Sequence, residues 1–95
     1  SEMIIERSRE LSPFKKRMET LEKEIIKLED EQQKLESSLI ELAEKGDSKK
    51  IQEASQRLGV VKKKVDESFD ELMEITVKHD ELFARYEVKL KDLEI

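Results

Sequence analysis

The sequence lacks cysteine and tryptophan, and its 95 residues include only one proline, two glycines, three phenylalanines and one tyrosine. The absence of cysteine excludes a disulfide framework and favours a reducing compartment, so we expect a cytoplasmic protein. A chain this short buries only roughly 60 to 65 % of its unfolded surface even when globular, which excludes a large enclosed core. No apolar run approaches the roughly 18 residues that span a bilayer, so we expect no membrane partner.

Sequence motifs for catalysis are also missing. There is no Gly-x-x-x-x-Gly-Lys phosphate loop and no cysteine nucleophile, and the pattern predicts no strand and turn that would hold a reactive serine. We therefore expect no enzymatic activity and no catalytic or cofactor-binding residue in this chain. His79 is the only histidine. Because a metal site needs several converging ligands, we interpret His79 as a packed core residue and expect no metal site.

Charge is what the sequence has in abundance. Asp, Glu, Lys and Arg make up 45 % of the chain, yet the net charge is only -5. This composition is typical of long solvated helices rather than of a globular core. It does not give the uniformly basic surface of a dedicated nucleic-acid-binding protein, so any such contact must be local.

Apolar residues recur in steps of three and four along both halves of the chain, which is the pattern of a heptad seam. The seam positions of the first half are Phe14, Met18, Leu21, Ile25, Leu28, Gln32, Leu35, Leu39 and Leu42. Those of the second half include Ile51, Ala54, Leu58, Val61, Val65, Leu72, Ile75, His79, Leu82 and Tyr86. Gln32 is polar, and the pattern leaves open whether it specifies the register or is merely part-exposed.

A reversal of the chain is predicted at residues 45–48, because Gly46 can end one helix while Asp47 or Ser48 caps the next. One register then joins every layer: Leu42 with Ile51, Leu35 with Leu58, Leu28 with Val65, Leu21 with Leu72, and Phe14 with His79. We therefore predict an all-α fold, with an antiparallel two-helix coiled-coil hairpin over residues 13–95. Residues 1–12 are predicted to form a short N-terminal helix that is kinked or broken near Pro13, because proline removes a backbone donor.

Side chains beside the seams support the same register. Opposite charges approach one another as Glu29 with Lys62, Glu31 with Lys64, and Glu10 with Arg85. Exposed pairs of this kind contribute only about 0.2 to 1 kcal/mol each, so they select the register more than they stabilise it. Phe69, Phe83 and Leu90 widen the apolar stripe, and either residues 1–12 or a second copy of the chain covers them. The second case predicts a homodimer.

Basic residues gather where the two ends of the hairpin meet. The group comprises Arg7, Arg9, Lys15, Lys16, Arg17, Lys78 and Arg85, with Tyr86 beside it as a ring on which a base can stack. From this group we select Arg9, Lys15, Lys16, Arg17, Lys78, Arg85 and Tyr86 as candidate nucleic-acid contacts. An ordinary solvated helix face is the alternative interpretation.

Two stretches resemble a known family. Arg9-Glu10-Leu11-Ser12-Pro13-Phe14-Lys15-Lys16 resembles the start of the C-terminal coiled-coil hairpin of ABC-F proteins, the soluble tandem ATP-binding cassette ATPases. Phe83-Ala84-Arg85-Tyr86-Glu87 resembles the aromatic-x-Arg-aromatic-Glu stretch that closes that hairpin. The resemblance extends over nearly the whole chain.

The resemblance implies a cytoplasmic ATPase that acts at the ribosome. In such a parent this domain would be an accessory coiled coil that contacts RNA, DNA or ribosomal components. ATP and Mg²⁺ would be bound by cassette motifs elsewhere in the parent. The alternative from the sequence is a structural or protein-interaction spacer, dimeric through the apolar residues beside its seam.

Overall fold

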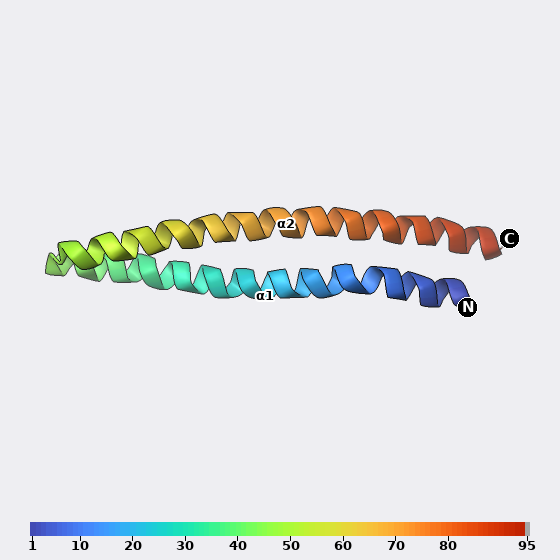
Figure 1. The fold of residues 1–95 in the computed structure, drawn as a ribbon, viewed down its shortest axis with the longest axis horizontal. Coiled ribbons are helices and arrows are strands. Elements are labelled where there is room, and N and C mark those ends of the chain that lie inside the picture. Colours follow the sequence, from blue (N-terminus) through green and yellow to red (C-terminus); the bar gives the residue numbers. More distant parts are fainter. Residues whose placement is uncertain (95) are drawn as a thin grey trace. The chain divides into compact units, whose positions relative to one another are not determined.

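The computed structural model describes residues 1–94 of the chain and the side chains of residues 1–93. Two helices follow one another, α1 (Glu2–Lys45) and α2 (Ser48–Glu94) (Figure 1), and the described residues contain no strand. Contacts between the two helices join early residues of α1 to late residues of α2, so the helices are antiparallel. The predicted all-α, antiparallel two-helix hairpin is confirmed.

Two compact units make up the chain, and each is built from a segment of both helices. We call residues 1–22, together with α2 from Asp70 onward, the terminal unit. Residues 23–69, which include the turn, form the turn unit. This division differs from the predicted division at Pro13, since both units contain a stretch of each helix.

The core of each unit is the predicted seam. In the terminal unit Leu11, Leu21 and Tyr86 are buried, with Leu21 only 1 % exposed. In the turn unit the buried residues are Ile25, Val61 and Val65. Burying a side chain of this size contributes about 1.5 to 3 kcal/mol, so the seam supplies the main attraction between the helices. Gln32 is half-buried, and its side-chain amide donates to Glu36 of its own helix at 3.2 Å.

The turn closes as a Schellman motif. Gly46 has a φ of 69°, a left-handed conformation that favours glycine, and the backbone N–H groups of Gly46 and Asp47 donate to the carbonyls of Ala43 and Leu42. The Asp47 carboxylate accepts from the backbone N–H of Lys50 at 3.2 Å and so caps α2. The predicted turn and the predicted Asp47 cap are both confirmed.

Pro13 does not divide α1. The helix runs from Glu2 through Lys45 with Pro13 inside it, so residues 1–12 are not a separate helix and α1 is not broken near Pro13; the other predicted outcome, a kink, stays a prediction. A proline in a helix interior costs about 3 kcal/mol. Seam residues lie on both sides of it, with Leu11 buried and Phe14 half-buried, and their packing offsets a cost of this size.

The charged partners beside the seam differ from those predicted. Glu31 accepts two hydrogen bonds from the guanidinium of Arg57, at 2.6 and 3.0 Å, rather than pairing with Lys64. Glu10 accepts from the Tyr86 hydroxyl rather than from Arg85. Among the described side chains no ion pair joins Glu29 to Lys62. The register is the predicted one, but the longer guanidinium of Arg57 reaches across where lysine was expected.

Replacing Leu21 by Ala tests how far the structure depends on the seam. We expect the free energy of unfolding to fall by about 2 to 5 kcal/mol, because a buried leucine leaves a cavity. Ile26→Ala is the matched control, since Ile26 is 67 % exposed, and should change the free energy by less than about 0.5 kcal/mol. Urea unfolding followed by circular dichroism measures both. Equal effects of the two substitutions would contradict the assigned seam.

Candidate nucleic-acid interface

All seven candidate residues belong to the terminal unit. The six basic side chains are exposed, whereas Tyr86 is buried. The heptad position of each residue decides which way its side chain points. Arg17, Lys78 and Arg85 occupy g positions along one edge of the helix pair. Lys15 lies at an e position on the opposite edge, and Arg9 and Lys16 lie on the outer face of α1, so the seven do not form one continuous cluster.

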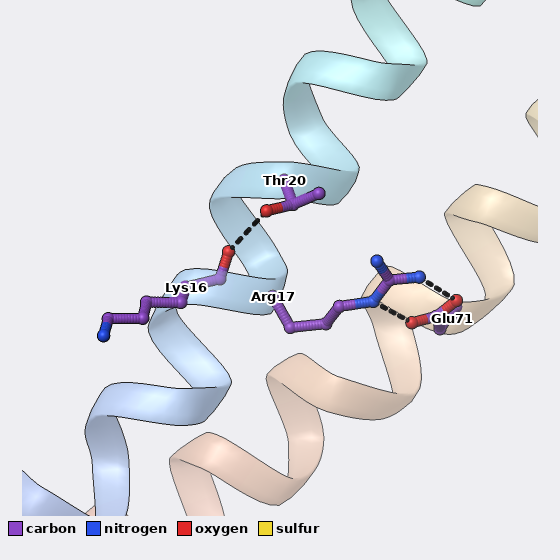
Figure 2. A network of polar contacts seen from close by, with 4 residues as sticks. All are labelled: Lys16, Arg17, Thr20 and Glu71. Atoms are coloured by element: carbon purple, nitrogen blue, oxygen red, sulfur yellow. Dashed lines mark hydrogen bonds and ion pairs between the residues drawn. The ribbon is translucent and has the colours of Figure 1, made fainter.

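Arg17 is engaged by the facing helix. Its Nε and Nη2 donate to the two carboxylate oxygens of Glu71, at 2.5 and 2.8 Å. Figure 2 shows the side chain of Arg17 extending to Glu71 on α2, whereas the side chain of the preceding residue, Lys16, points away from α2. The hydrogen bond from Arg17 lowers the pKa of Glu71, so this carboxylate stays ionised and neutralises the guanidinium. Arg17 therefore offers less charge to a ligand than its sequence position suggests.

Lys78 and Arg85 are brought together. They are one heptad apart on α2, and both line a groove of about 220 Å³ with Phe14, Glu81 and Leu82. Neither forms an ion pair with a carboxylate among the side chains of residues 1–93. The groove thus presents two uncompensated cations above an apolar floor, with Glu81 as the one acidic group in its lining.

Tyr86 was predicted to stack on a base, but the structure gives it a different role. Its side chain is only 2 % exposed, and its hydroxyl donates to the Glu10 carboxylate at 2.6 Å. The ammonium of Lys89 lies 5.1 Å from the ring centroid. The hydrogen bond to Glu10, with burial as a second cause, raises the pKa of Tyr86 to about 12. Because the ring is enclosed, the prediction that Tyr86 stacks on a base is wrong.

A second set of contacts, which was not predicted from the sequence, holds the same end of the terminal unit together. Arg7 forms an ion pair with Glu87 at 2.9 Å and lies 5.7 Å from the centroid of the Phe83 ring. Phe83 in turn stacks on His79, with ring centroids 6.3 Å apart and an interplanar angle of 14°. The heptad spacing could have predicted these contacts. Arg7 occupies a d position of the seam, where the charge of an arginine needs an acidic or aromatic partner.

His79 lies at its predicted seam position and is partly buried. Its Nδ1 is 3.0 Å from a carboxylate oxygen of Asp80, and its Nε2 is buried with no hydrogen-bond partner in the described structure. Within residues 1–94 no group of three or more histidine, cysteine, aspartate or glutamate side chains is arranged to hold a metal ion. Neither described helix has a stretch apolar enough over sufficient length to span a membrane.

Comparison with known proteins yields no relative: no family model, no curated protein and no solved structure matches this chain.

The enclosed Tyr86 gives a pH-dependent prediction. Since Tyr86 is the only tyrosine and tryptophan is absent, the ultraviolet absorbance of tyrosinate reports on this side chain alone. The folded chain should titrate with a midpoint near 12, and the urea-unfolded chain near 10. The folded pKa is the higher one, so the stability that Tyr86 contributes is complete below about pH 10 and is lost as the pH rises through the folded value.

Glu10→Gln provides the control for this titration. It removes the charged acceptor, so the tyrosinate midpoint should move down towards the unfolded value. Circular dichroism at each pH checks that the helices persist. A midpoint near 10 for the unsubstituted chain, while it is still helical, would contradict the Tyr86–Glu10 hydrogen bond.

Proposed function

We propose that this chain is the accessory coiled-coil domain of an ABC-F type ATPase and that it contacts nucleic acid or ribosomal components without itself being catalytic. The observation that supports this is the contact between the two stretches on which the family resemblance rests. Residues 9–16 and 83–87 lie at opposite ends of the chain, yet Tyr86 donates to Glu10 at 2.6 Å. In this proposal ATP and Mg²⁺ are bound by cassettes outside residues 1–95, and the parent works in the cytoplasm.

The nucleic-acid contact is assigned to the terminal unit. Lys78 and Arg85 carry this contact, because both line the same groove and neither forms an ion pair with a carboxylate among the described side chains. At 1.5 Å per residue their backbones are about 10 Å apart, which lets each side chain reach a different phosphate. Arg9, Lys15 and Lys16 contribute further positive charge from other faces of the unit. Arg17 contributes least, because Glu71 holds it.

A structural or protein-interaction spacer is the second candidate function. The observation in its favour is that Phe69 and Phe83 are 45 % and 42 % exposed, although Leu90 is half-buried. A homodimer through these residues would bury them. Light scattering separates the two functions: a monomer favours the accessory domain, and a dimer that dissociates on Phe69→Glu favours the spacer.

Reversing the charges in the groove tests the proposed nucleic-acid interface. The double variant Lys78→Glu/Arg85→Glu should weaken binding of a labelled single-stranded RNA of about 20 nucleotides by about a hundredfold or more, because the two charged hydrogen bonds together are worth roughly 3 to 6 kcal/mol. The dependence of log K on log salt should also become shallower by about two, one for each phosphate that is no longer neutralised. Fluorescence anisotropy over a range of salt concentrations measures both, with DNA of the same sequence as a second ligand.

The matched control is Lys62→Glu/Lys63→Glu. It makes the same change in net charge on the same helix, but within the turn unit. We expect it to weaken binding only slightly. An equal loss of affinity in both variants would show that only the overall charge matters, and no measurable binding of the unmodified chain at low salt would exclude the nucleic-acid interface.

A further inference from the structure

The outward face of α2 in the terminal unit carries an apolar strip that none of the described side chains covers. Met73, Val77, Ala84 and Val88 are spaced so that, at 100° per residue, they fall within about 60° of one another on the helix. Met73 is 67 % exposed, Val77 51 % and Val88 60 %, and Ala84 is exposed as well. We call these four residues the outer ridge. They lie away from the seam, so the hairpin itself does not explain them.

The outer ridge is also hollowed. A groove of about 420 Å³ lies at its Met73 and Val77 end, lined by these two residues and by Glu74, Lys78 and Glu81. The apolar side chains form its floor and the charged ones its rim. A knob from a facing helix fits such a depression between residues four apart.

Acidic residues border the outer ridge on both sides. Asp80 and Glu87 flank it towards the e edge, and Glu74 and Glu81 flank it towards the g edge. Among the cations of α2, Lys78 also lines the groove, Arg85 lies one row further out, beyond Glu81, and Lys91 follows the last ridge residue. The strip that a partner would cover is therefore apolar at its centre, and Glu74, Asp80 and Glu81 give its margins negative charge, whereas Glu87 is neutralised by its ion pair with Arg7.

We infer that the outer ridge docks an amphipathic helix of a partner protein whose apolar stripe is flanked by lysine or arginine. Helices bind in this way through anchors spaced like those of the ridge. The ridge extends over the 16 residues from Met73 to Val88, about 22 Å, so the complementary helix has about four turns. Charge decides between this partner and a second copy, because pairing two outer ridges would place acidic margins against each other. This surface adjoins the groove proposed to contact nucleic acid, and the two share Lys78 and Glu81 in their linings.

A designed peptide tests the inference on the full chain. The probe is a fluorescein-labelled helix of about 18 residues with a leucine stripe flanked by lysine. Its controls are a peptide of the same composition in scrambled order and a version with glutamate in place of lysine. The ordered leucine–lysine peptide should bind at least about tenfold more tightly than the scrambled one, and the glutamate version should not bind measurably.

Variants of the chain locate the site. Met73→Gln/Val77→Gln should reduce binding of the ordered peptide to the level of the scrambled one, whereas Ile26→Gln/Ile40→Gln should not change it. The control pair removes two side chains of similar exposure, 67 % and 66 %, from the turn unit. All four positions are exposed, so circular dichroism should show that the helices are retained. Glu74→Lys/Glu81→Lys should also weaken binding, and more strongly at low salt.

Three outcomes would overturn the inference. The first is equal binding of the scrambled and ordered peptides, which would mean that charge alone attracts them. The second is unchanged binding by Met73→Gln/Val77→Gln, which would place the site elsewhere. The third is a dimer in light scattering that Met73→Gln/Val77→Gln dissociates, which would make a second copy the occupant of the ridge.

Discussion

Burial of one apolar seam between two antiparallel helices is the interaction on which the rest of this structure depends. Neither helix could remain stable alone with such a composition, because most of its surface is charged and only one stripe can be removed from water. Leu21 and Val61 are almost completely enclosed, one in each unit. Everything outside the seam is then free to vary, since exposed charges contribute little to stability.

The seam changes character towards the chain ends. Around Leu21 the seam is aliphatic. Near the two chain ends, Arg7 of α1 and His79 and Tyr86 of α2 occupy seam positions. These side chains carry polar atoms that are costly to bury without a partner, and Glu10 and Glu87 are the partners of Tyr86 and Arg7, whereas Nε2 of His79 has none in the described structure. The result is a terminal unit held by aromatic and charged contacts as well as by packing. The charged side chains on the outer faces of the terminal unit lie outside these contacts and are exposed to other molecules.

Much of the fold follows from the periodicity of the sequence. The seam, the antiparallel register and the turn at Gly46 with its Asp47 cap all depend on short-range spacing, which the sequence states directly. The predicted break at Pro13 does not occur. Proline weakens a helix locally, but Leu11 and Phe14 pack on either side of it and keep the helix continuous. Tertiary burial outweighs a single unfavourable residue when the seam continues past it.

The candidate site was harder to predict, because it depends on which side chains meet across the helices. Sequence spacing placed seven candidate residues near the two chain ends, and the structure has all seven in the terminal unit. It could not show that Glu71 holds Arg17 or that Glu10 accepts from the hydroxyl of Tyr86. Both contacts join residues on different helices, and the choice among several nearby carboxylates depends on side-chain reach rather than on heptad position.

The two-residue turn has a consequence for how the chain folds. Contacts across the helices close progressively longer loops: Arg57 and Glu31 are 26 residues apart, Arg17 and Glu71 are 54 apart, and Arg7 and Glu87 are 80 apart. Without earlier contacts, closing the longest of these loops costs about 1 kcal/mol more than closing the shortest. We therefore expect the helices to zip together from Gly46 outward. The Arg7–Glu87 ion pair, next to the buried ring of Tyr86, would then be the last contact to form and the first to break.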